Sequence, residues 1–164
     1  MAVAIYMSTA GMNLTYGVET TPGEKPSAFK IIQGVTSLGE ISSEKEQIEV
    51  TPLSAEEYKE YVGGLADPGG TWEVGFNESN ALHEEWATIM SEYKTAIASG
   101  NRMWFGAYHP RHDEEFFIVG EPNALGFGGA EVSSAFSNTG RITINKVEGW
   151  SSAIAPTDST PGEP

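Results

Sequence analysis

The sequence predicts one mainly β domain, a sandwich or small barrel of about seven strands with one flanking α-helix. Short stretches of alternating or β-branched residues recur between turn signals, and the 164 residues include 19 glycines. One segment, residues 80–99, carries an apolar stripe at helical spacing. The length suits a single domain that buries a core of its own.

The first half of the chain contains three predicted strands. Residues 28–35 are rich in β-branched and aromatic side chains, and residues 47–51 alternate polar and apolar until Pro52 ends the pattern. Residues 71–76 alternate again, so three large side chains share one face: Trp72, Val74 and Phe76. We expect that face to lie in the core.

The predicted helix follows. Its stripe keeps one face over about four turns and consists of Leu82, Trp86, Ile89, Tyr93 and Ile97. Ser79 or Asn80 can cap its N-terminus, and Gly100 suits the position after its C-terminus. Because the stripe is narrow and the other face is polar, we expect the helix to lie on a sheet.

Four more strands are predicted after the helix, at residues 103–108, 115–120, 131–136 and 140–147. Residues 137–140 are interpreted as a hairpin turn between the last two of them.

These elements divide the chain into three parts. Residues 1–26 show no period and are predicted to be an arm, either a frayed terminus or one held by a partner. Residues 27–150 form the β domain. Residues 151–164 contain three prolines and little bulk, so we expect a disordered tail.

A long connection, residues 53–70, separates two of the strands. Connections above about 12–15 residues are uncommon unless they are functional. This one carries apolar groups that need a covering surface, namely Tyr58, Tyr61, Val62 and Leu65. Two interpretations remain open: a short helix folded back onto its own domain, or a protruding element that packs on another subunit.

The charge of the chain excludes several classes of function. There are 23 acidic residues against 9 Lys plus Arg, a net charge of −14. Nucleic-acid binders and anionic membrane surfaces require clustered basic residues. The absence of cysteine excludes disulfides, thiolate nucleophiles and cysteine-based metal sites. No apolar run approaches the roughly 20 residues of a membrane helix, and the apolar residues 1–7 lack the basic flank of a signal peptide. We therefore expect a soluble protein made in the cytosol of its producing cell.

The acidic excess has two interpretations. It can be a solvated face that aids solubility, or a surface that repels a polyanion and lets nucleic acid pass without binding. The candidate acidic positions are Glu40, Glu44, Glu46, Glu49 and Glu73.

No motif predicts catalysis or a cofactor. His109 and His112, followed by Asp113 and Glu114, could ligate zinc, with His83 as the further histidine required. A polar turn between two strands explains the same residues better. Nucleophile motifs are absent, and the glycine-rich segments 63–70 and 126–129 lack the spacing of a phosphate loop. We predict no catalytic residues, no metal site and no cofactor.

Taken in order, several segments resemble the major tail tube proteins of long, non-contractile-tailed bacteriophages, the lambda-like tail tube family. The resemblance spans roughly residues 27–148. Its most specific parts are Ile48-Glu49-Val50-Thr51-Pro52-Leu53, Tyr58-Lys59-Glu60-Tyr61-Val62-Gly63-Gly64-Leu65-Ala66-Asp67 and Gly70-Thr71-Trp72-Glu73-Val74. The helix at 77–99, and Ile142-Thr143-Ile144 with Gly149, fit the family's later elements.

The resemblance implies a β-sandwich with a flanking helix whose copies form hexameric rings. Stacked rings would make the hollow tail tube of a virion, through which DNA passes without specific binding. Implied partners are further copies of the chain, a tape-measure protein, a tail terminator and tail-tip or initiator proteins. No membrane is involved, and synthesis would take place in the host cytoplasm.

The resemblance also implies roles for two segments. The connection 53–70 and the arm 1–26 would bridge stacked rings. The predicted contact residues in the connection are Leu53, Tyr58, Lys59, Tyr61, Val62, Leu65 and Asp67. The acidic positions named above would line the lumen or the outer surface.

Two alternatives remain at this point. The chain could be the ring protein of a related injection system, such as type VI secretion, which resembles the same fold. It could instead be a monomeric β-sandwich that binds a ligand such as carbohydrate, which would need an exposed aromatic platform.

Overall fold

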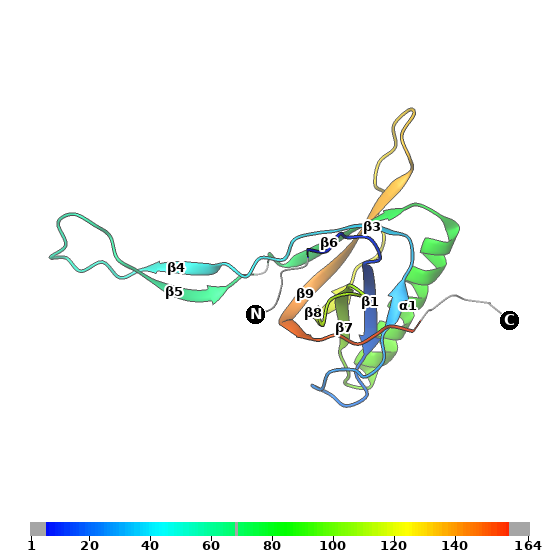
Figure 1. Ribbon diagram of the computed structural model, residues 1–164, viewed down its shortest axis with the longest axis horizontal. Coiled ribbons are helices and arrows are strands. Elements are labelled where there is room, and N and C mark those ends of the chain that lie inside the picture. The colour runs from blue at the N-terminus through cyan, green and yellow to red at the C-terminus, as the bar shows by residue number, and fades with distance from the viewer. Residues whose placement is uncertain (1–5, 68, 158–164) are drawn as a thin grey trace.

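A computed structural model describes residues 6–67 and 69–157 (Figure 1). Its elements are, in chain order, β1 (Asn13–Val18), β2 (Lys30–Ile32), β3 (Val35–Leu38), β4 (Lys45–Glu49), β5 (Tyr61–Ala66), β6 (Thr71–Asn77), α1 (Asn80–Ala98), β7 (Met103–Tyr108), β8 (Glu114–Pro122) and β9 (Ser137–Ser152). The predicted fold class, mainly β with one flanking helix, is confirmed.

Seven strands form one antiparallel sheet in the order β2-β1-β7-β8-β9-β6-β3. The two edge strands, β2 and β3, are consecutive in the chain and only Gln33 and Gly34 separate them. Opposite edges of a flat seven-stranded sheet could not be joined by two residues, which span only about 7 Å. The sheet is therefore curled, and its edges approach each other at this turn.

The main core lies between the inner face of the curled sheet and α1. Trp72, Val74 and Phe76 of β6 are buried there, as the alternation predicted. The helix contributes Leu82, Trp86 and Ile89, whereas Tyr93 is only partly buried and Ile97 lies in solvent. Two indole N–H groups anchor loops, because Trp72 donates to the Gly39 carbonyl and Trp86 to the Asn123 carbonyl, both at 2.7 Å.

The opposite face of the sheet carries a smaller apolar cluster, made of Phe29, Trp104, Phe117 and Val119. Segments from near both ends of the chain cover it. Lys25 lies over the Phe117 ring at 4.1 Å, and Ile154 packs against the cluster. Beside it lies the buried carboxyl of Glu115, which accepts hydrogen bonds from the Thr15 hydroxyl and the Ile154 amide. Burial raises the pKa of Glu115, although those hydrogen bonds and Lys25 oppose the effect.

The helix begins where the sequence placed it. Ser79 is its N-cap and accepts a hydrogen bond from the Leu82 amide, so Asn80 becomes the first helical residue. Gly100 follows with a positive φ of 78°, the left-handed conformation that commonly ends helices and that glycine adopts without strain.

Three predicted elements, two strands and one turn, are wrong. Residues 28–35 do not form one strand, because the turn at Gly34 divides them between β2 and β3. Residues 131–136 lie outside any strand, in the long β8–β9 connection. Residues 137–140 are not a hairpin turn; they begin β9 and pair with β6, for example Ser137 with Asn77.

The predicted terminal segments also need correction. Within the supposed arm 1–26, residues 13–18 form β1, an interior strand that pairs with both β2 and β7. The supposed tail beginning at 151 first continues β9. Thr157 then forms a bridge with Lys30 of β2, and its amide donates to the carbonyl of the preceding residue, Phe29, at 2.9 Å. Residues 1–5 and 158–164 lie outside the described residues.

A buried carboxylate joins the end of β1 to the start of β7. Glu19 is 1% exposed and accepts hydrogen bonds from the Arg102 guanidinium and amide and from the Trp104 indole, at 2.7–3.3 Å. Burial acts to raise the pKa of Glu19, but the hydrogen bonds from Arg102 and Trp104 outweigh it and hold the pKa below its ordinary value.

Glu19→Gln should destabilise the protein by about 3 kcal/mol at pH 7, because removing one partner of a buried pair leaves the other poorly compensated. Because the pKa of Glu19 is lower in the folded than in the unfolded protein, the ionised carboxylate stabilises the fold at pH values above its ordinary pKa. That stabilisation is lost as the pH falls through the pKa of the folded state. The gap between variant and parent should therefore narrow below about pH 4. Urea unfolding at several pH values measures it, with the exposed Glu24→Gln as control; an equal effect of the control would contradict the assignment.

Candidate assembly surface

The β4–β5 hairpin projects from the body of the molecule (Figure 1). Among the described strands, β4 and β5 pair with each other and with no other strand. They form an antiparallel ribbon in which Ile48 lies opposite Val62 and Glu49 lies opposite Tyr61. We call residues 45–66, and no longer residues 1–26, the arm, and we call residues 50–60 its tip. At the tip, Thr51 and Glu60 are joined by hydrogen bonds between the Thr51 hydroxyl and the Glu60 backbone. The long connection protrudes, so the folded-back helix is wrong. That the protruding element packs on another subunit remains a prediction.

Apolar side chains on the arm lie in solvent. One face of the ribbon carries Ile48, Val50 and Val62, each about half exposed. The other face carries Tyr61 beside Glu49. Isolated two-stranded hairpins are marginally stable in water, so this ribbon lacks a covering layer.

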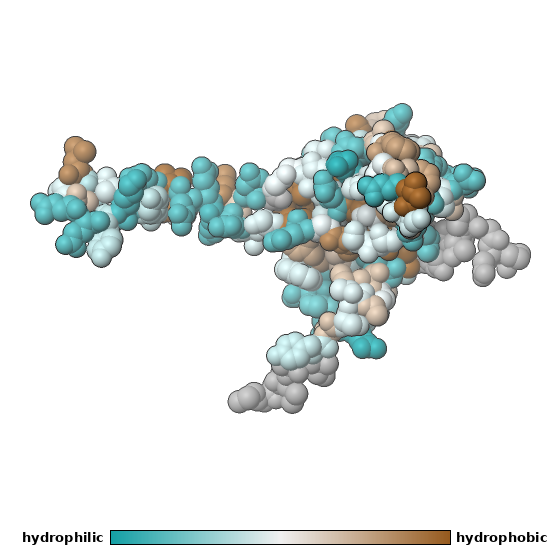
Figure 2. All heavy atoms as spheres, turned by 90° about the horizontal axis from the view of Figure 1, so that it is seen from above, coloured by the Kyte–Doolittle hydropathy of each residue, from teal (hydrophilic) through white to brown (hydrophobic). Residues whose placement is uncertain are grey.

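The tip of the arm carries two strongly exposed apolar side chains. Leu53 has a relative exposure of 107% and Tyr58 one of 81%. Figure 2 shows hydrophobic spheres at the end of the arm among hydrophilic ones. Three glutamates, Glu56, Glu57 and Glu60, accompany them. A projecting apolar group rimmed by charge is typical of a protein–protein contact.

The structure places all seven predicted contact residues on or beside the arm. Leu53, Tyr58 and Lys59 belong to the tip, and Lys59 lies 3.9 Å from Glu49. Tyr61, Val62 and Leu65 are in β5. Asp67 instead shapes the return to β6, since its carboxylate accepts a hydrogen bond from the Gly69 amide. Their role in contacts between copies remains a prediction.

Sequence reasoning missed half of the ribbon. The glycine pair Gly63-Gly64 indicated a turn, but these residues lie in β5, where Gly64 leaves space for the Ile48 side chain across the ribbon. The prediction therefore placed Ile48 and Val50 on a strand, but it did not show that these residues form the apolar face of the arm together with Val62. The period-two pattern of β4 was the signal that could have identified them.

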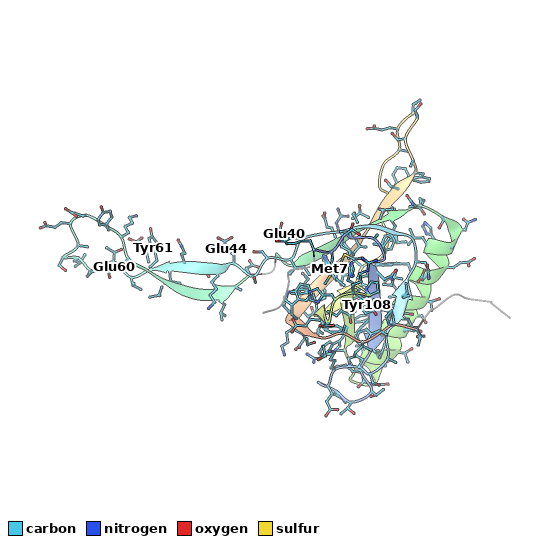
Figure 3. All side chains as sticks on the ribbon, viewed as in Figure 1. Met7, Glu40, Glu44, Glu60, Tyr61 and Tyr108 are labelled. Carbon is cyan, nitrogen blue, oxygen red and sulfur yellow. The ribbon has the colours of Figure 1, made fainter. Side chains whose placement is uncertain are left out.

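The five acidic candidates do not gather on one face. Glu40 and Glu44 lie at the base of the arm, whereas Glu60 and Tyr61 lie further out (Figure 3). Glu46 and Glu49 are three residues apart in β4, so they point to opposite faces. Glu73 is on β6, where Arg141 lies 3.4 Å away. Their assignment to a lumen remains a prediction.

Exposed apolar groups also gather on the body. The β8–β9 connection carries Phe127, Val132 and Phe136, with the two phenyl rings in an edge-to-face pair 6.0 Å apart. Near the β7–β8 turn, the exposed groups are Met7, Met12 and Trp150.

The two histidines that were considered as zinc ligands accept hydrogen bonds from backbone amides at the β7–β8 turn. His109 Nδ1 accepts a hydrogen bond from the Arg111 amide, and His112 Nδ1 accepts one from the Glu114 amide. Within the described residues, no three His, Asp or Glu side chains come together as a metal site. No helix in the part of the chain that the structure describes is long and apolar enough to cross a membrane.

Comparison with known proteins identifies the family of this chain. The model of a family described as phage tail tube, lambda-like, matches residues 6–100, more than half of the chain. The chain belongs to the lambda-like phage tail tube family. It is thus a structural tail tube protein of a virion tail, and the matched stretch contains the whole arm. No curated protein matches the sequence.

Several solved structures share the fold of this tail tube protein at low identity. A chain in the tail of an empty gene transfer agent particle with C6 symmetry is 14% identical, with a TM-score of 0.55 over 90% of this chain and 99% of that one. A chain in the tube-terminating cap of the anti-feeding prophage is 14% identical, with a TM-score of 0.54 over 93% and 95%. A chain in the sheath/tube terminator of the PVC contractile injection system is 9% identical, with a TM-score of 0.54 over 89% and 97%.

The arm should be dispensable for folding of the subunit. Because Lys45 and Ala66 are paired at its base, residues 46–65 can be replaced by Asn-Gly, which favours a two-residue hairpin turn. We expect the free energy of unfolding to change by less than about 0.5 kcal/mol, since no core residue is removed. Urea unfolding followed by tryptophan fluorescence measures this, and a broad or shifted transition would contradict it.

Proposed function

We propose that this tail tube protein assembles into hexameric rings that stack into a hollow tube for passage of a phage genome. The observation that carries the proposal is the arm, a solvent-exposed ribbon with an apolar face and an apolar tip. Such a ribbon gains stability when a second copy covers it. The sixfold symmetry of the gene transfer agent tail, whose chain shares this fold, supports the ring size.

The shape of the subunit favours stacking over closed pairing. We propose that an arm on one side of the molecule docks on a different surface of the next copy without a reciprocal exchange, which makes the contact heterologous. Heterologous contacts close into rings or extend into open stacks. A tube requires both kinds of contact, one within a ring and one between rings, and the arm supports the second kind.

The acidic excess supports a second part of the proposal, that acidic groups face the channel. With a net charge of −14, a lumen lined by carboxylates would repel the phosphate backbone and let DNA slide. We propose Glu40, Glu44, Glu46, Glu49 and Glu73 as candidates for this lining. Glu73 is the one that lies on the main sheet.

Partners and the absence of catalysis belong to the same proposal. A tape-measure protein inside the growing tube, a terminator and a tip or initiator complex would control its length and its ends. We propose a structural role without enzymatic activity, in keeping with the tail tube family. Synthesis in the host cytoplasm would precede assembly.

Covering the apolar face of the arm should drive assembly. Val62→Ser should raise the protein concentration needed for tube formation at least tenfold, because a half-exposed valine loses its buried partner surface. Negative-stain electron microscopy with sedimentation measures this. Ile97→Ser, a matched change of a half-exposed residue on α1, should leave assembly unchanged. Equal effects, or unsubstituted protein that stays monomeric at every concentration, would favour the rival monomeric binding module.

The lining can be mapped because the chain has no cysteine. Glu73→Cys in assembled tubes should react with a small maleimide but not with a maleimide on a large polyethylene glycol that cannot enter the channel. Glu84→Cys, at an exposed position of α1, should react with both the small and the large maleimide. Reaction of the Glu73 position with the large reagent would place it outside, and reaction with neither reagent would place it in a subunit contact.

A further inference from the structure

The body of the subunit contains a small apolar hollow that its own arm does not fill. It lies beside the turn between β7 and β8 and has a volume of about 200 Å³. Its apolar lining consists of Met7, Met12, Ala107 and Trp150, and its polar lining of Ser8, Thr9, His109, His112 and Glu114. Met7, Met12 and Trp150 are 42%, 37% and 59% exposed. Large apolar side chains around a concave site mark a binding surface.

The hollow is built by directed contacts. His109 is buried, and because its Nδ1 accepts the Arg111 amide, its Nε2 carries the proton and donates to the Ser8 carbonyl at 2.7 Å. This bond ties the segment with Met7 and Met12 to the β7–β8 turn. On the other side, the His112 ring stacks on Trp150 at 5.1 Å, so the indole has a fixed place.

The arm carries the complementary shape. Leu53 projects from the tip without any covering atoms, and a hollow of about 150 Å³ already accommodates a benzene-sized group. Within one copy the two features cannot meet, since the arm extends away from the body on which Met7 lies (Figure 3). A projecting apolar group and a complementary hollow on different faces produce a contact that repeats from copy to copy.

The charges beside the two features also match. Arg111, at the turn next to the hollow, makes no ion pair with any acid among the described residues, although most of the other basic side chains are paired. Leu53 is followed by Glu56 and Glu57. Asp113 belongs to the same turn as Arg111, and Glu114, the first residue of β8, lines the hollow itself. The expected match is therefore between individual groups rather than between oppositely charged patches.

From these observations we infer that the hollow beside the β7–β8 turn receives Leu53 from the arm of a second copy, with Arg111 facing Glu56 or Glu57. The inference rests on the proposed function and names the receiving surface in the stack. Another hollow is less suitable. It lies beside the aromatic pair of Phe127 and Phe136, and no arginine or lysine adjoins its lining residues in the sequence to face Glu56 or Glu57.

Cross-linking between single-cysteine variants tests the pairing directly, because the natural chain has no cysteine. Leu53→Cys and Met12→Cys proteins are mixed, assembled into tubes and treated with a short bis-maleimide. We expect cross-linked dimers that contain one copy of each variant. Leu53→Cys mixed with Phe127→Cys, at the competing hollow, is the matched control and should give none.

A charge exchange tests the second contact. Arg111→Glu should raise the concentration needed for assembly several-fold, and adding Glu56→Arg and Glu57→Arg should restore most of the loss. Lys94→Glu, which makes the same charge change on α1, should have no effect. Tubes that form normally with Leu53 cross-linked to Phe127 rather than Met12 would overturn the inference but leave the proposed function intact. Failure of the unsubstituted protein to assemble would overturn both.

Discussion

Curling of the seven-stranded sheet is the constraint on which the rest of the structure depends. The edge strands β2 and β3 are joined through Gln33 and Gly34, so the sheet must bring its two ends together. The Gly34 φ of 78° permits the tight reversal. The Gln33 amide also donates to Glu85 on α1, which ties the turn to the helix that covers the core. The curl creates a closed interior, and the helix completes it.

That closure decides what the subunit leaves uncovered. β4 and β5, which follow the edge strand β3, pair with each other and do not join the main sheet. The arm therefore leaves the body as a ribbon of its own, and its apolar face remains in solvent. The segment at Thr157 hydrogen-bonds to the backbone beside β2, so one sheet edge is partly covered by the chain itself. Exposed apolar side chains therefore lie on the arm as well as on the body, at the β8–β9 connection and beside the β7–β8 turn.

The sequence predicted the parts of this structure that depend on local periodicity. The alternation at Trp72, Val74 and Phe76 and the spacing of Leu82, Trp86 and Ile89 record burial on one face, and each of these side chains is buried. Ser79 was one of two cap candidates because hydroxyl and amide side chains cap equally well. Only the position of the preceding strand decides between them.

Features that depend on distant contacts were not predictable in the same way. β1 reads as irregular because Thr15 and Gly17 occupy one of its faces, yet both are buried. Thr15 binds Glu115, and Gly17 makes room for the approach of Phe29. Both partners are remote in the sequence. The family resemblance identified the segment containing the arm, but the hollow at Met12 and Trp150 joins residues from opposite ends of the chain, which no local pattern connects.

The balance between charge and apolar surface gives the assembly its physical character. A subunit with a net charge of −14 repels its copies over about a Debye length, roughly 10 Å at 0.1 M salt. The arm extends its apolar tip away from the body, so contact can be made while the bodies are still apart. Association then depends on burying a few side chains such as Leu53 and Val62 against this repulsion. Because the ribbon alone is marginally stable, docking also orders it, and the entropy of that ordering opposes assembly of isolated subunits. Added salt screens the repulsion but leaves the ordering cost unchanged, so a preformed surface that already holds one layer of arms lowers the barrier for the next.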